Sequence, residues 1–271
     1  MTNSPTVVIQ SASDTSGGPP RGGRSTPSPG GRNEQLSAYT RPNLQRSVLA
    51  LATSVVPFLG LWVLMLLWMK GFPDRARERA LEGIQLAERL HHPQSIAYAH
   101  FHAGLIHIWR REPERAREHA HAVLELADTH EFPVWAAAGA CLHGAAIAAS
   151  GSVDDGLARF EVAIEQYRAL QMPPVFWPAL LQLNAGMLGL AGRPAEGVAC
   201  VSEALDVIAE LPEPQMMSSE LLLLKGTLVL ADANDAAEAE VWIERAVQRA
   251  DELEAPMLQL RARMRVIGLI P

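Results

Sequence analysis

The feature that most constrains the fold is an internal repeat of about forty residues. Five turn segments, GFPD, REPE, GSVD, GRPA and NDAA, recur along the chain, and the steps between their equivalent positions are 40, 40, 41 and 42 residues. These positions serve as turn markers: Pro73, Pro113, Val153, Pro194 and Ala236. Such a period is typical of solenoid proteins, in which each unit stacks on the next.

Each unit is predicted to be a pair of amphipathic helices. Residues 93–132 are the representative unit, with a tight turn at Glu112 and Pro113 between the two helices. A small residue recurs nine or ten positions before the turn marker, at Gly104, Gly144, Ala185 and Gly226, and another three positions after it, at Ala76, Ala116, Gly156, Gly197 and Ala239. Small side chains at these offsets allow the paired helices to cross closely. A proline precedes most first helices, at Pro93, Pro133, Pro174, Pro214 and Pro256.

This pattern resembles the tetratricopeptide (TPR) repeat. A small residue in the first helix, a second small residue twelve positions later and a bulky residue four further on reproduce its signature. The period of 40 to 42 exceeds the roughly 34 residues of that family, so the extra residues must lengthen the helices or their links. HEAT-type hairpins have this period without the small-residue signature and are the second choice. We therefore expect an all-α, right-handed TPR-like solenoid of about five helical hairpins over residues 71–271.

Residues 57 to about 270 also resemble the C-terminal TPR region of large bacterial signalling ATPases and adenylate/guanylate cyclase fusion regulators. The segments GFPD, RREP and EFPVWA carry this likeness. The chain contains neither a GxxxxGK[ST] phosphate loop nor a cyclase-like segment. The resemblance implies a sensor or scaffold portion without the catalytic parts.

Residues 1–46 are predicted to be a disordered tail. They contain seven Ser, six Gly and six Pro with few large apolar side chains, so burial cannot offset the entropy of ordering the backbone. The tail contains five arginines and only two acidic residues, Asp14 and Glu34, so its net charge is +3. Since the whole chain has a net charge of −7, the remaining residues carry −10. Because an acidic body is a poor partner for a polyanion, we expect no nucleic-acid partner.

Residues 47–70 are predicted to form an apolar helix. The 23 positions between Arg46 and Lys70 carry no charge. A helix over 48–69 would span roughly 33 Å, enough to cross a bilayer. The alternatives are a single-pass transmembrane helix and the first helix of the repeat. Leu64 stands where the TPR pattern requires a small residue, which weakens the second reading.

No catalytic or metal-binding pattern is found. Side chains two positions apart on a helix point about 200° apart. His100 and His102 therefore do not share a helix face, and neither do His119 and His121. We expect these histidines to be solvated or at the core edge. The chain has no HExxH or GxSxG motif, and its two cysteines, Cys141 and Cys200, lie in different units. We therefore expect no enzymatic activity, cofactor or metal.

The predicted binding surface is the concave groove lined by the first helices of a solenoid. Projecting TPR groove positions onto this chain gives an aromatic side, a small-walled side and one amide. The candidate groove residues are Tyr98, Phe101, Leu105, Trp109, Cys141 and Gln182, with Ile108, Ala138, Ala145, Ala148, Ala149, Gly186 and Gly189 beside them. Such a groove suits an apolar helix or an extended peptide. It lacks the Lys/Arg/Asn set with which chaperone-type TPR proteins hold a carboxylate.

The sequence after Pro256 begins a first helix without a second one. An uncapped solenoid end exposes an apolar face, so we expect truncation, homo-oligomer formation or a helix folded back as a cap. The leading functional hypothesis is a non-enzymatic scaffold or sensor in the bacterial cytoplasm that binds a protein or peptide ligand. The alternative is a repeat protein anchored in the inner membrane through residues 48–69.

Overall fold

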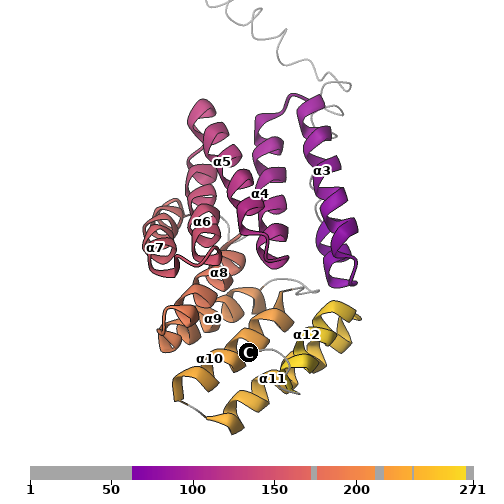
Figure 1. Ribbon diagram of the computed structural model, residues 1–271, viewed down its shortest axis with the longest axis vertical. Helices are drawn as coiled ribbons and strands as arrows, with labels where there is room; N and C mark the ends of the chain where they lie inside the picture. The colour runs from indigo at the N-terminus through magenta and orange to yellow at the C-terminus, as the bar shows by residue number, and fades with distance from the viewer. Residues whose placement is uncertain (1–62, 172–175, 211–216, 234, 267–271) are drawn as a thin grey trace, which may run out of the picture. The chain divides into compact units, whose positions relative to one another are not determined.

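A computed structural model describes residues 63–171, 176–210, 217–233 and 235–266. Every regular element in these ranges is a helix. Residues 63–69 are helical and are followed by ten labelled helices (Figure 1). Their bounds are α3 Pro73–Arg89, α4 Pro93–Trp109, α5 Pro113–His130, α6 Pro133–Ala149, α7 Val153–Ala169, α8 Trp177–Leu190, α9 Pro194–Ala209, α10 Ser218–Ala233, α11 Ala236–Glu252 and α12 Pro256–Val266. The prediction of an all-α fold is confirmed.

The five turn markers are the first residues of the second helices. Helices α3, α5, α7, α9 and α11 begin at Pro73, Pro113, Val153, Pro194 and Ala236. Proline suits this position because the first turn of a helix has no intrahelical acceptor for its N–H groups. Helices α4, α6 and α12 likewise begin at a proline. Helix α8 instead starts at Trp177 and α10 at Ser218, after the predicted Pro174 and Pro214, which lie outside the described residues.

Consecutive helices pair into hairpins, α4 with α5, α6 with α7, α8 with α9 and α10 with α11, and each hairpin contacts the next (Figure 1). Most of these helices have 16 to 18 residues, and α8 has 14. Turns of three residues join α3 to α4 and α4 to α5. The long period is therefore absorbed by longer helices.

The predicted small residues lie where the paired helices cross. A Cβ atom added to Gly144 would be 2.8 Å from the carbonyl oxygen of Gly156, and one added to Gly226 would be 2.8 Å from that of Ala239. Real Cβ contacts are not this short, so these crossings require glycine. The offset pattern is thus explained by backbone contact inside these two hairpins, whereas a Cβ atom added to Gly104 would meet the side chain of Leu142 in α6.

A left-handed residue ends most of the helices at regular intervals. His91, Arg111, Glu131 and Gln171 have φ between 49° and 60°, and Gly71, Gly151 and Gly192 occupy the same place in other turns. At Arg111 the following N–H, that of Glu112, donates to the carbonyl oxygen of His107 over 2.9 Å. This arrangement closes the helix and reverses the chain.

First and second helices differ in how much of their surface is buried. Helix α4 buries residues on almost every side, whereas α5 buries a single stripe, Ala116, Ala120, Val123 and Ala127. A first helix packs against its own partner and against the preceding hairpin, so it is apolar nearly all round. The main core runs from α4 to α10 and includes Phe101, Phe160 and Leu180, which are fully buried.

Residues 63–69 pack against the C-terminal end of the repeat. Leu64, Trp68 and Met69 are buried in one cluster with Ala255 and Leu258. The Nζ atom of Lys70 donates to the carbonyl oxygen of Glu254 over 2.6 Å. The start of α12 therefore packs in one core with segment 63–69, while the expected fold-back of the final helix as a cap stays a prediction. A homo-oligomer through this helix stays a prediction.

The apolar run is described only in part. Residues 48–62 and the predicted disordered tail, 1–46, lie outside the described residues. Over the part of the chain that is described, no helix combines the length and apolar character needed to cross a membrane. The observed segment, 63–69, belongs to the core of the repeat, where Leu64 is buried in one cluster with Ala76 and Ala80 of α3 and with Leu258 of α12.

Candidate functional site

A groove of about 340 Å³ runs along the inner side of the repeat. Apart from Arg111, which follows α4 in its turn, all lining residues belong to first helices. They are Ile108 and Trp109 from α4; Ala145, Ala148 and Ala149 from α6; Gln182, Leu183, Gly186, Met187 and Leu190 from α8; Glu220, Leu223, Leu224 and Thr227 from α10; and Arg261 from α12. The groove is therefore the surface on which a TPR-like solenoid presents its inner helices.

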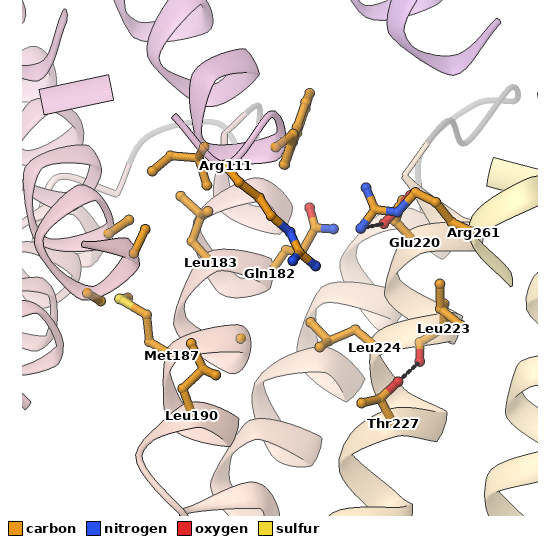
Figure 2. Close-up of a pocket in the computed structure, with 16 residues that line it drawn as sticks. Arg111, Gln182, Leu183, Met187, Leu190, Glu220, Leu223, Leu224, Thr227 and Arg261 are labelled. Carbon is orange, nitrogen blue, oxygen red and sulfur yellow. Dashed lines mark hydrogen bonds and ion pairs between the residues drawn. The ribbon is translucent and has the colours of Figure 1, made fainter. Parts of the chain in front are cut away.

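Arg111 brings a cation into the groove. Its backbone is left-handed, with φ of 60°, and its side chain extends from the end of α4 toward Gln182 (Figure 2). Within the described ranges no acceptor pairs with this guanidinium. The neighbouring Arg110, by contrast, contacts Asp74 at 3.1 Å and Glu112 at 2.9 Å.

Arg261 and Glu220 form an ion pair in the same groove. The Nη2 atom of Arg261 lies 3.3 Å from Oε2 of Glu220 (Figure 2). The other oxygen of Glu220, Oε1, is buried and has no hydrogen-bond partner among the described residues. Burial raises the pKa of this carboxyl, and Arg261 opposes that rise. With two arginines and one glutamate, the lining carries a net charge of +1 when Glu220 is ionised.

The rest of the lining is apolar. Figure 2 shows Met187 and Leu190 away from the charged groups. Leu190 is 71% exposed, which leaves its side chain free to contact a ligand. A site of this size, largely apolar with a few converging polar groups, has the character of a ligand pocket.

A smaller cavity of about 30 Å³ continues the groove past its charged end. The two cavities share Trp109, Gln182, Glu220 and Arg261. The smaller one is also lined by Met65, Trp68, Met69, Met217 and Leu258. The rings of Trp68 and Trp109 lie 5.7 Å apart, so the segment 63–69 forms an end wall.

The predicted groove residues divide into two groups. Trp109 and Gln182 line the groove, as do Ile108, Ala145, Ala148, Ala149 and Gly186 beside them. Phe101, Leu105 and Cys141 are buried in the core and do not line it, so the groove proposed below excludes them. The first helices have neighbours on both sides, which leaves only the C-terminal ends of α4 and α6 facing the groove.

Tyr98 packs in an aromatic cluster and not on the groove wall. Its ring centroid is 4.3 Å from that of His102 and 5.8 Å from that of Phe176. Phe176 also lies 5.2 Å from Phe101 and 5.5 Å from Trp135. The residue before α8 therefore covers the N-terminal half of α4, where the sequence suggested an open aromatic surface.

The charged groove residues were missed by the sequence analysis. Arg111 and Arg261 do not occupy the projected TPR groove positions, because Arg111 lies in a turn and Arg261 in the final helix. Glu220 resembles any other acidic residue in a first helical turn. The only signal for Arg111 was its place at a turn that recurs every twenty residues.

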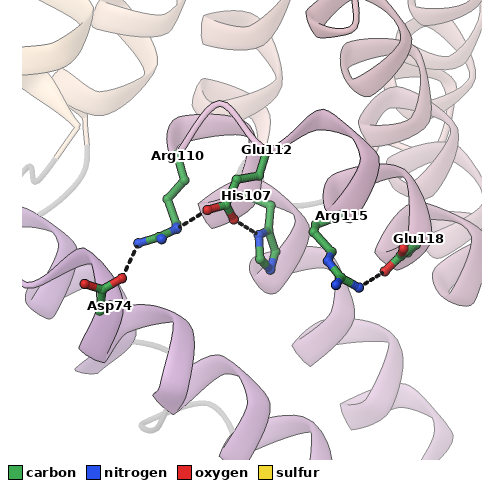
Figure 3. A network of polar contacts seen from close by, with 6 residues as sticks. All are labelled: Asp74, His107, Arg110, Glu112, Arg115 and Glu118. Atoms are coloured by element: carbon green, nitrogen blue, oxygen red, sulfur yellow. Dashed lines mark hydrogen bonds and ion pairs between the residues drawn. The ribbon is translucent and has the colours of Figure 1, made fainter.

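The histidines form ring contacts across α4, α5 and α6. Nδ1 of His107 lies 2.6 Å from Oε2 of Glu112, and the pair continues to Arg110 and Asp74 (Figure 3). His100 and His119 are joined by a 3.0 Å contact between their Nδ1 atoms. Burial lowers the pKa of His119 to about 4, so its ring is neutral at pH 7. In the described part of the chain no group of three or more His, Cys, Asp or Glu is arranged to hold a metal ion.

The helical hairpins and the groove between their first helices define a TPR-like helical-repeat fold. The structure is similar to a crystal structure of Bacillus thuringiensis PlcR in complex with the peptide PapR7 and DNA, with a TM-score of 0.61 and 14% sequence identity. The match covers 82% of this chain and 76% of PlcR. At this identity the likeness shows a shared fold. No protein-family model matches the chain, and no curated protein matches it.

Proposed function

We propose that this protein is a peptide-binding module whose ligand lies in the groove between α4 and α12. The observation that carries the proposal is the origin of the lining, since all five first helices from α4 to α12 contribute residues to one cavity. The PlcR structure, which shares the fold, holds a peptide. A binding role is also consistent with the absence of nucleophile and phosphate-loop motifs in the sequence.

The regulatory setting follows from the sequence resemblance. The module would serve as the sensor or scaffold portion of a bacterial signalling protein similar to the ATPase and cyclase regulators, in the cytoplasm. The PlcR structure holds DNA as well as a peptide, so the absence of a nucleic-acid partner stays a prediction. Anchoring through residues 48–69 stays the alternative. Segment 63–69 is engaged in the core, which argues against it.

Filling the groove is the direct test. A Cβ atom added to Gly186 meets no atom within 4 Å, so Gly186→Leu starts a side chain from an open position on the groove lining. Gly83, in α3 outside the groove, also has open space around its Cβ position and gives the matched control Gly83→Leu. Peptides selected from a synthetic heptapeptide library should bind the parent protein and Gly83→Leu, and should lose affinity for Gly186→Leu. Equal binding to all three proteins would place the peptide site elsewhere.

A further inference from the structure

We infer that the groove recognises a peptide by its carboxyl terminus, with Arg111 and Arg261 binding the terminal carboxylate beside the amide of Gln182. The inference rests on the proposed function and adds the direction in which the peptide lies in the groove. It makes the ligand a peptide with a free C-terminal carboxylate and apolar side chains. Charge, the end wall and the apolar lining each support it.

The charge of the groove selects an anion. Arg111 is exposed, lines the groove and has no partner among the described residues. A guanidinium binds a carboxylate through two parallel N–H···O bonds, which are stronger than bonds between neutral groups. The net charge of +1 also disfavours the ammonium group of a peptide N-terminus. An anionic end of the ligand therefore fits where Arg111 points.

Arg261 can bind the same anion, because its contact with Glu220 holds it at the groove. The single contact of 3.3 Å between them leaves most of the donors on Arg261 unused. Glu220 is a positioning residue, because it holds Arg261 at the groove without forming a bidentate pair. Its buried, unpartnered Oε1 is consistent with a proton on this carboxyl, which would leave the charge of Arg261 for the ligand.

The end wall favours a chain terminus over an internal acidic side chain. Met65, Trp68 and Leu258 line the smaller cavity beyond Arg261 and narrow the groove at this end. A peptide that ran through the groove would meet this wall at the arginines, whereas a peptide that ends there would not. The methionine side chains can adjust to the last residue of the ligand.

The apolar lining sets the rest of the ligand. Leu183, Met187, Leu190 and Leu224 lie along the groove from the charged end. Beyond Glu220 and the two arginines, the residues that line it carry no charge. The residues that precede the terminal carboxylate are therefore expected to be apolar, in an extended segment or a short helix.

The test uses three pools of N-acetylated heptapeptides with randomised apolar residues. The first has free C-terminal acids, the second has C-terminal amides, and the third has amides with one internal Glu. Each pool is mixed with the full chain, bound members are separated by gel filtration and identified by mass spectrometry, and dissociation constants are measured for the best members. The acid pool should be retained, and its members should bind about 10- to 100-fold more tightly than their amides.

Arg111→Gln supplies the variant. Gln171 has φ of 49° at the equivalent turn, so glutamine is compatible with this backbone. The variant should lose the preference for acids over amides while its melting temperature is unchanged. The matched control is Arg115→Gln, which removes an exposed arginine paired with Glu118 outside the groove and should keep the preference (Figure 3).

The outcomes separate this inference from the proposed function. Equal retention of acids and amides would overturn carboxylate recognition and leave the peptide module intact. Retention of the third pool as strong as that of the first would assign the carboxylate to a side chain and overturn the terminal polarity. Failure of every pool to bind, or a groove filled by a second copy of the chain in sedimentation experiments, would overturn both proposals.

Discussion

Gly144 and Gly156 touch through their backbones where α6 crosses α7, and a Cβ atom added to Gly156 would lie 2.6 Å from the carbonyl oxygen of Gly144. The same atom would be 2.4 Å from the backbone nitrogen of Ala148. Since backbone atoms cannot move aside as a flexible side chain can, any larger residue must separate the helices. The shortest approach inside this hairpin therefore depends on these two glycines.

Gly156→Ala is expected to destabilise the protein. Overpacking of a well-packed crossing costs about 1–3 kcal/mol, and the better helix propensity of alanine returns up to about 1 kcal/mol. The free energy of unfolding, from urea titration followed by circular dichroism, should fall. Gly83→Ala is the control, because its added Cβ meets no atom within 4 Å and should stabilise α3. Equal effects of the two substitutions would refute the crossing argument.

The repeat could be predicted from sequence because its cause is local. The residues that permit the crossings, Gly144, Gly156 and Gly226, stand at fixed offsets from the turns, so both helix pairing and helix bounds follow from the pattern. Helix α8 was harder to place, since Trp177 and not Pro174 begins it. Glycine is needed at these positions because the two helices of one hairpin approach each other closely there.

The site was predicted less well because it depends on contacts between distant units. The projected positions assume that one face of each first helix is open, but Phe176 covers the N-terminal half of α4 and buries Phe101. Arg261 lies in the last helix and lines the same groove as residues of α4 only because the intervening hairpins stack as they do. Neither relationship appears in the spacing of residues along the chain.

Phe101→Ala is expected to act on stability. The side chain is fully buried in the main core, so its removal should lower the free energy of unfolding by about 3–5 kcal/mol. Phe72→Ala is the matched control, because Phe72 is 48% exposed and should contribute much less. Differential scanning calorimetry can compare the two melting temperatures. A normal melting temperature for Phe101→Ala would mean that Phe101 is not a core residue and faces the groove.

Leu64→Ala is expected to weaken the junction between segment 63–69 and α12. Leu64 is fully buried in one cluster with Ala255 and Leu258, so truncation should cost about 2–5 kcal/mol. Leu66, two positions later on the same helical segment, is 44% exposed and gives the control Leu66→Ala. Chemical denaturation in detergent-free buffer measures both. If the two substitutions had the same small effect, segment 63–69 would not belong to the folded core.

The stability of the protein is expected to fall as the pH drops from 7 toward 4, with His102 as a main contributor. His102 is buried, and its Nδ1 atom lies 2.9 Å from the carbonyl oxygen of Tyr98. Burial lowers the pKa of His102 to about 4, and the hydrogen bond to Tyr98 opposes this shift. The unfolded chain, with the ordinary histidine pKa of 6.5, binds a proton first as the pH falls. The stabilisation is therefore complete above pH 6.5 and is lost between pH 6.5 and 4, by about 1.4 kcal/mol per pH unit.

His102→Asn separates this effect from the other histidines. Asparagine retains an N–H group that can donate to the carbonyl oxygen of Tyr98, but it does not titrate. Urea denaturation at half-unit steps from pH 4 to 8 should show a flatter pH dependence for this variant. The residual slope comes from His119, whose pKa is also lowered to about 4 by burial, and from His100 and His143, whose pKa values burial lowers as well. Exposed His130 gives the control His130→Asn, which should keep the parent slope because its removal leaves these other rings in place. An unchanged slope in His102→Asn would mean that the buried ring is not the group that couples protonation to unfolding.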